Sequence, residues 1–160
     1  MSAGRGRDTG GEGYLELDEL YQDVILDHNR RPRNFRALDG GRVAEGFNPL
    51  CGDRFVVHVR VEKNVIADVS FQGSGCAISK ASASLMTEGI KGKTLAEAET
   101  LFNRFQQMIT APPNSPPDHL GKLTALAGVR QFPVRIKCAS LAWHALHAAL
   151  HARDELVSTE

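Results

Sequence analysis

Four side chains in this sequence have the chemistry of metal ligands: Cys51, Asp53, Cys76 and Cys138. Each lies near an expected end of a helix or strand, where side chains from different elements can meet. A tetrahedral zinc ion takes four such ligands, with thiolate sulfur at about 2.3 Å and carboxylate oxygen at about 2.0–2.2 Å. Gly52 lets the chain turn so that Cys51 and Asp53 face one point. These residue types therefore favour a zinc site of three thiolates and one carboxylate.

The cysteine spacing by itself leaves a second interpretation open. The sequence has no Cys-x-x-Cys pair, and the separations of its three cysteines match no zinc-finger pattern. Free cysteines are also commonly buried as small apolar side chains. The local sequence favours the metal site, because Cys51 and Cys76 each adjoin a glycine, which suits a ligand-binding loop better than a packed core.

The composition limits the classes of protein to consider. A chain of 160 residues with 42% hydrophobic and 24% charged residues fits one globular domain with its own core. Nineteen basic residues balance nineteen acidic ones, and no apolar run approaches the ~20 residues that span a bilayer, so we expect neither a nucleic-acid nor a membrane partner. Three cysteines cannot all pair within one chain, which favours reduced thiols and a cytoplasmic protein.

Alternating apolar residues predict a small antiparallel sheet. Apolar side chains recur at every second position over residues 55–62 and again over residues 65–72, with a turn at residues 63–64 between them. Residues 42–47 are expected to add a third strand. The residues expected on the apolar face of the second stretch are Val65, Ala67, Val69 and Phe71.

Helical spacing of apolar residues predicts the remaining elements. A first helix is expected before Pro32, Thr94 and Glu97 form the capping box of a later helix, and Pro133 opens the last one. Strands that come early and helices that follow indicate an α+β domain, with a sheet of about three strands covered on one face by helices. We expect a disordered tail over residues 1–13, a single domain over residues 14–152 and a flexible C-terminal tail over residues 153–160.

The histidines near the end of the chain are open to two interpretations. His144, His147 and His151 recur at helical spacing, which could hold a second metal ion on one helix face. The interpretation that we favour is that they line a half-exposed face of the helix. His28 is expected to cap or pack the first helix rather than bind a ligand.

Four motifs in order carry a resemblance to a known family. They are Leu20-Tyr21 through Asp27-His28 with Pro32-Arg33-Asn34; Asn48-Pro49-x-Cys51-Gly52-Asp53; Phe71-x-Gly73-x-Gly75-Cys76-x-Ile78-Ser79; and Phe132-Pro133-x-Arg135-Ile136-Lys137-Cys138. With these motifs the chain resembles the U-type iron–sulfur assembly proteins, the family of the NifU N-terminal domain, IscU and SufU, over roughly residues 17–150. The resemblance implies their α+β fold and a role in iron–sulfur cluster assembly.

Two departures from the IscU pattern resemble the SufU branch of this family. IscU-type scaffolds carry histidine immediately before the third cysteine and a shorter spacer ahead of it, whereas this chain has Lys137 and a longer spacer with a proline-rich loop at residues 111–118. By this resemblance, the three cysteines and Asp53 hold zinc, and Cys51 accepts persulfide sulfur from a SufS-like cysteine desulfurase. Lys137 is then either a solvated charge or a participant in persulfide exchange.

Three functions therefore stay open at the level of the sequence. The first is a zinc-dependent sulfurtransferase that activates a desulfurase rather than acting as a stand-alone enzyme. The second is a scaffold on which a transient iron–sulfur cluster forms on Cys51, Cys76 and Cys138 and passes to downstream assembly proteins. The third is a domain in which zinc is purely structural, and removal of the metal would then unfold the chain.

Overall fold

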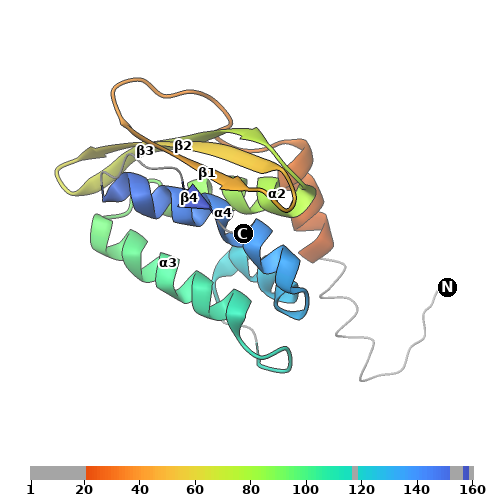
Figure 1. Ribbon diagram of the computed structural model, residues 1–160. Coiled ribbons are helices and arrows are strands. Elements are labelled where there is room, and N and C mark those ends of the chain that lie inside the picture. Colours follow the sequence, from red (N-terminus) through yellow and green to blue (C-terminus); the bar gives the residue numbers. More distant parts are fainter. Residues whose placement is uncertain (1–20, 117–118, 152–156, 159–160) are drawn as a thin grey trace.

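The computed structural model describes residues 21–116, 119–151 and 157–158. Helices pack on one face of a twisted sheet, and a short helix over residues 21–30 precedes the first strand (Figure 1). No helix within these described ranges combines the length and the apolar character needed to cross a bilayer. The elements are β1 (Arg42–Asn48), β2 (Asp53–Glu62), β3 (Val65–Ser74), α2 (Ala77–Ile90), α3 (Leu95–Thr110), the 3₁₀ helix η1 (Gly121–Gln131), α4 (Pro133–Leu150) and β4 (Val157–Ser158).

The sheet has the strand order β3-β2-β1-β4. Its three long strands pair antiparallel, which confirms the predicted α+β architecture. The fourth strand has only two residues, Val157–Ser158, and pairs parallel to β1. This strand lies within residues 153–160, which we expected to be a flexible C-terminal tail. The expected N-terminal tail, residues 1–13, lies outside the described residues. The predicted division of the chain into a domain and two tails therefore stays a prediction.

The apolar face of β3 differs from the simple alternation. Val61 pairs with Ile66, but Arg60 pairs with Asp68, so that β3 has one extra residue at this point. Such a bulge shifts the inward and outward phase of a strand by one position. Ile66 is fully buried, whereas Val65 and Ala67 are only half-buried, and the prediction was wrong for these two residues. Val69 and Phe71, beyond the bulge, face the core as expected.

The core lies between the sheet and its covering helices. Helix α4 packs across β1 and β2, and α2 packs on β3. Phe105 of α3 stacks on Trp143 of α4, with ring centroids 4.4 Å apart. This contact packs α3 against α4, the helix that covers β1 and β2. The predicted capping box at the start of α3 is confirmed by hydrogen bonds in both directions between Thr94 and Glu97.

A contact between α2 and α4 sets the distance between two of the cysteine-bearing segments. Ala81, Ser82 and Ala83 of α2 are fully buried, and their small side chains allow α4 to approach closely. The Ser82 hydroxyl donates to the carbonyl of Ala139 at 2.5 Å and accepts from Trp143 Nε1 at 3.2 Å. Ala139 directly follows Cys138, so this buried contact holds the Cys138 turn of α4 against α2.

Replacing Ser82 by alanine tests this contact. The indole N–H of Trp143 would lose its partner in the core, which costs about 1–3 kcal/mol of unfolding free energy. Urea denaturation followed by far-UV circular dichroism measures this loss. The control is Thr100→Ala on the exposed side of α3, which should change the free energy by no more than about 0.5 kcal/mol. Equal effects of the two substitutions would contradict the role of Ser82.

Candidate metal centre

The turn between β1 and β2 presents Cys51 and Asp53. The buried Asn48 closes this turn, because its carbonyl accepts from the Gly52 amide at 2.8 Å and its side-chain oxygen accepts from the Leu50 amide at 3.1 Å. Gly52 has a φ of +75°, a conformation that residues with a side chain rarely adopt. The turn therefore holds Cys51 at its exposed tip and Asp53, 1% exposed, at the start of β2.

Cys76 caps the N-terminus of α2. Its sulfur accepts a hydrogen bond from the Ser79 amide at 3.4 Å, and the partial positive charge of the helix end stabilises negative charge at this position. The Cys76 amide donates to Asp53 Oδ1 at 3.0 Å, and the Cys76 sulfur lies 3.8 Å from Asp53 Oδ2. The buried carboxylate thus connects the β1–β2 turn to the start of α2.

Gly75 makes room for this carboxylate. A Cβ atom at this position would lie 2.6 Å from Ser79 Oγ and 2.8 Å from Asp53 Oδ1. Real Cβ atoms essentially never come so close, so any larger residue would push one of these groups away. From the sequence, this glycine indicated only a ligand-binding loop beside Cys76. Its contact with Asp53 depends on the folded chain, and no local sequence pattern announces it.

Cys138 completes the cluster from α4. It is only 3% exposed, and its sulfur lies 3.6 Å from the Cys51 sulfur. Burial, together with the hydrogen bond to Cys51, raises the pKa of the Cys138 thiol well above its ordinary value. A cation that binds here must therefore displace the proton of Cys138.

The distances between the donor atoms fit a single ion. Two sulfur ligands of a tetrahedral zinc ion lie roughly 3.8 Å apart when each bond is about 2.3 Å. The sulfurs of Cys51 and Cys138 are 3.6 Å apart, and the donor atoms of Cys51, Asp53 and Cys138 all lie within 4.8 Å of one another. Cys76 is not a member of this group of three, but its sulfur adjoins the group through the 3.8 Å contact with Asp53. The structure thus brings three of the predicted ligands together with the fourth beside them, and three thiols with one carboxylate are a donor set that suits zinc.

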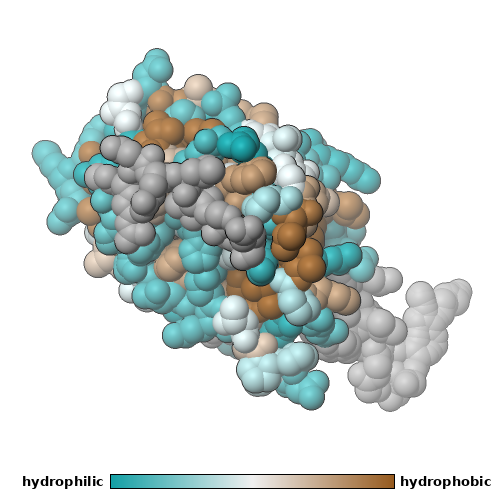
Figure 2. All heavy atoms as spheres, viewed as in Figure 1, coloured by the Kyte–Doolittle hydropathy of each residue, from teal (hydrophilic) through white to brown (hydrophobic). Residues whose placement is uncertain are grey.

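One side of the cluster opens onto an apolar surface. Leu50, beside Cys51, is 66% exposed, and Phe132 and Val134, before Cys138, are 51% and 55% exposed. A cavity of about 530 Å³ lies next to the start of α4, with Ile78 and Phe132 among its lining residues. Figure 2 shows apolar atoms gathered over the side of the molecule where the β1–β2 turn and the start of α4 lie in Figure 1. Two exposed cysteines therefore adjoin a surface that suits a protein partner.

Two further residues that the sequence singles out are His28 and Lys137. His28 is buried, its Nδ1 lies 2.7 Å from Ser84 Oγ, and burial lowers the pKa of its imidazole. It packs the first helix against α2, as expected. Lys137 is half-buried and forms no ion pair with any other described residue, so both interpretations of its role stay predictions.

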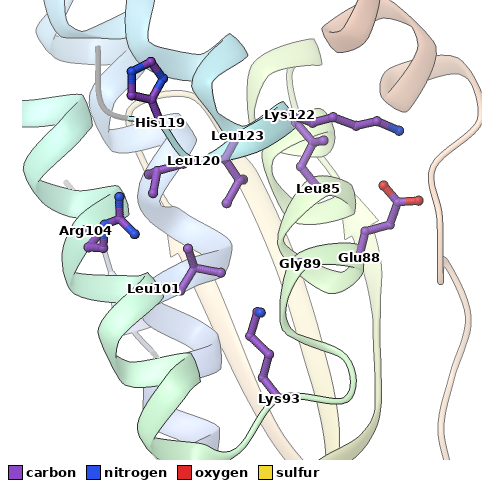
Figure 3. A pocket seen from close by; sticks show the side chains of 10 residues that line it. All are labelled: Leu85, Glu88, Gly89, Lys93, Leu101, Arg104, His119, Leu120, Lys122 and Leu123. Atoms are coloured by element: carbon purple, nitrogen blue, oxygen red, sulfur yellow. The ribbon is translucent and has the colours of Figure 1, made fainter. Parts of the chain in front are cut away.

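A second cavity, of about 470 Å³, lies between α2, α3 and η1 (Figure 3). Leucine side chains line this cavity together with four charged residues, Glu88, Lys93, Arg104 and Lys122. Glu88 Oε1 lies 3.6 Å from Nε2 of the buried His28. None of the four predicted ligands lines this cavity, so its chemistry is separate from that of the thiols.

The fold and the cluster define a class of protein: an α+β domain that gathers three thiols and a carboxylate from a hairpin turn, a helix N-terminus and a last long helix. Residues 20–139 match the family model described as the NifU-like N terminal domain, and the chain belongs to this family. The predicted resemblance is thereby confirmed.

Curated relatives and solved structures agree with this assignment. The chain is 42% identical over 139 residues to the "Zinc-dependent sulfurtransferase SufU" of Bacillus subtilis, with 87% of this chain and 94% of the relative covered. It is 42% identical over 135 residues to the "Iron-sulfur cluster assembly scaffold protein IscU" of Streptococcus pyogenes, with 84% and 85% covered. A crystal structure of a putative SUF-system scaffold protein from Fervidobacterium islandicum has a TM-score of 0.74 and 32% identity, with 82% and 97% covered.

Replacing Gly75 by alanine tests the cradle of Asp53. The added methyl group would displace the carboxylate from the Cys76 amide, and we expect zinc affinity to fall roughly tenfold or more, as it does when the support of a ligand is removed. Competition with a chromophoric chelator measures the affinity. Gly128→Ala is the matched control, because a Cβ there meets nothing within 4 Å. Unchanged affinity in a folded Gly75→Ala protein would show that Asp53 does not need this position.

Proposed function

We propose that Cys51, Asp53, Cys76 and Cys138 bind one zinc ion, and that the chain accepts persulfide sulfur on Cys51 from a cysteine desulfurase during iron–sulfur cluster assembly. The observation that carries this proposal is that the sulfur of the exposed residue Cys51 lies 3.6 Å from the sulfur of the buried residue Cys138. Similarity over most of the chain to a relative named as a zinc-dependent sulfurtransferase supports it.

The exposures of the four residues suit different roles. Asp53 and Cys138 are buried and anchor the centre, whereas Cys51 and Cys76 face solvent. Bound zinc would hold the thiolates deprotonated at neutral pH. Cys76 is tied to the start of α2 by the Ser79 amide, while Cys51 lies at the tip of a turn, with the freedom to meet a partner. Cys51 is therefore the acceptor in this proposal.

The sulfur transfer is a thiol exchange without net oxidation. The Cys51 thiolate attacks the terminal sulfur of the persulfide on the desulfurase, and a new S–S bond forms on Cys51. The S–S bond of the donor breaks at the same time, and its cysteine leaves as a thiolate. In this proposal Lys137, the neighbour of Cys138 in the sequence, would stabilise the negative charge that moves between the sulfurs.

The surface around Cys51 supports a protein donor. A persulfide on another protein must come within bonding distance of the sulfur, so the partner must cover the opening. The apolar side chains of Leu50, Phe132 and Val134 beside this opening would be buried by such a partner. The free thiols fit a reducing compartment, and we place the chain in the cytoplasm.

A scaffold function is the second candidate. Iron–sulfur clusters are held by thiolates, and in this second proposal Cys51, Cys76 and Cys138, of which Cys51 and Cys76 are exposed, would together hold the cluster. The relative from Streptococcus pyogenes is named as a scaffold protein. The two functions differ in what the isolated chain carries. A sulfurtransferase retains zinc and stimulates the desulfurase, whereas a scaffold acquires a coloured cluster that passes to an acceptor protein.

Removing the acceptor sulfur tests the main proposal. Cys51→Ala should abolish the stimulation of a SufS-type desulfurase, because no thiolate would remain to take the persulfide. Alanine released from cysteine measures turnover, and mass spectrometry of the wild-type chain should find one added sulfur atom on the peptide that contains Cys51. The Thr100→Ala protein should stimulate as the wild type does. Full stimulation by Cys51→Ala would rule out the acceptor role.

Removing the carboxylate tests its role as a ligand. In Asp53→Ala the centre loses one donor, and the Cys76 amide loses its acceptor, so we expect zinc to leave faster and bind at least roughly tenfold more weakly. Zinc release to a chelator, followed over time, measures this change. A protein that kept both full zinc content and full desulfurase stimulation would contradict the role of Asp53.

A further inference from the structure

Two histidines near the end of α4 face one glutamate of α3. Glu99 Oε2 lies 3.3 Å from His147 Nε2, and Glu99 Oε1 lies 3.6 Å from His151 Nε2. The donor atoms of these three residues all lie within 4.8 Å of one another. In Figure 1 the C-terminal end of α4 runs beside the beginning of α3, which brings the three side chains together from two elements. We refer to Glu99, His147 and His151 as the α3–α4 cluster.

The α3–α4 cluster contains only two of the three histidines that the sequence suggested as a metal site. His144 does not belong to it, because its Nε2 atom lies 3.2 Å from Gln106 Nε2 and its ring meets Phe102 edge-on. His147 and His151 are four residues apart and so lie on one helix face. The carboxylate ligand comes from Glu99 on the facing helix α3.

We propose that the α3–α4 cluster is a second metal site, which binds a divalent first-row transition metal through two imidazoles and one carboxylate. This donor set suits zinc, iron(II), cobalt(II) and nickel(II). An ion with bonds of about 2.0–2.1 Å holds adjacent donors roughly 3.0–3.4 Å apart. The 3.3 Å separation fits this range, and the 3.6 Å separation needs only a small movement of the exposed His151.

Packing holds one of the two imidazole rings in place for metal binding, and solvent reaches all three side chains. His147 stacks on Phe102, with centroids 4.7 Å apart, so that the plane of its imidazole is set by packing. The side chains of His147, Glu99 and His151 are 25%, 42% and 49% exposed. An ion can therefore enter from solvent without opening the core. Solvent can fill the coordination positions that the protein leaves open.

The α3–α4 cluster is independent of the thiol centre. His147 of α4 and His151, the C-cap residue of the same helix, follow Cys138 by nine and thirteen residues, which corresponds to roughly 14–20 Å along the helix axis. The two sites share no residue and differ in chemistry, since one is rich in sulfur and the other has only nitrogen and oxygen donors. The second site would give the chain a place for a cation while the thiols hold zinc or sulfur.

Simple ion pairing is the competing explanation for the same contacts. A protonated histidine beside Glu99 would form an exposed ion pair, which contributes at most about 1 kcal/mol and requires no metal. A metal site requires neutral imidazoles and gives a measurable stoichiometry. Metal binding by the intact chain separates the two explanations.

In the test, the full chain without a histidine tag is loaded with one equivalent of zinc per chain. It is then titrated with cobalt(II) at neutral pH and followed by calorimetry and visible absorption. We expect one cobalt equivalent with weak d–d bands and no sulfur charge-transfer band. Glu99→Gln and His151→Ala should each weaken this binding roughly tenfold or more. His144→Gln, on the same helix but outside the cluster, is the matched control and should bind cobalt as the wild type does.

Two results would overturn the proposal. One is that no cobalt equivalent binds outside the thiols, so that all bound cobalt shows sulfur charge-transfer absorption. The other is full retention of that equivalent in the folded double variant His147→Ala/His151→Ala, checked by circular dichroism. A chain that starts without zinc at its thiols should bind two equivalents, of which only one shows sulfur charge transfer. Because no desulfurase is present, the result is separate from the test of sulfur transfer.

Discussion

The buried carboxylate of Asp53 is the constraint on which the candidate centre depends. Asp53 starts β2, is 1% exposed, and accepts the backbone amide of Cys76 at 3.0 Å. A charged group out of contact with water is costly unless it is paired or hydrogen-bonded, so the chain must supply partners at this point. Those partners come from the start of α2, and the same contact brings the Cys76 sulfur next to the turn that carries Cys51. One interaction thus joins a hairpin to a helix end and sets the shape of the site.

The last side of the centre depends on close packing between helices. Cys138 reaches the cluster only because α4 lies tightly on α2, across small residues and the hydrogen bonds of Ser82. Two sulfurs remain exposed next to apolar surface, while the third and the carboxylate are buried. This combination of a rigid inner half and an open outer half suits a metal centre that exchanges sulfur with a partner, more than one that only holds a fold together.

Much of the architecture followed from local patterns. Alternating residues predicted the hairpin of β2 and β3, Thr94 and Glu97 predicted the start of α3, and four motifs in order indicated the family. The features that local patterns did not predict arise where distant segments interact. The inward residue of β3 is Ile66 because of a bulge opposite β2, and β4 takes its two residues from a segment with little to bury. Neither feature has a signal within its own stretch of sequence.

The sequence by itself determined which side chains can bind a metal, which of them adjoin glycine and helix ends, and to which family the chain belongs. Residue type, period and order are properties of the chain, and they survive without any tertiary contact. The tertiary structure alone decided the distances between the donors, the exposure that distinguishes Cys51 from Cys138, and the pairing of Glu99 with His147 and His151. These depend on how α3, α4 and the sheet pack, because residues far apart in sequence meet only after the core has formed.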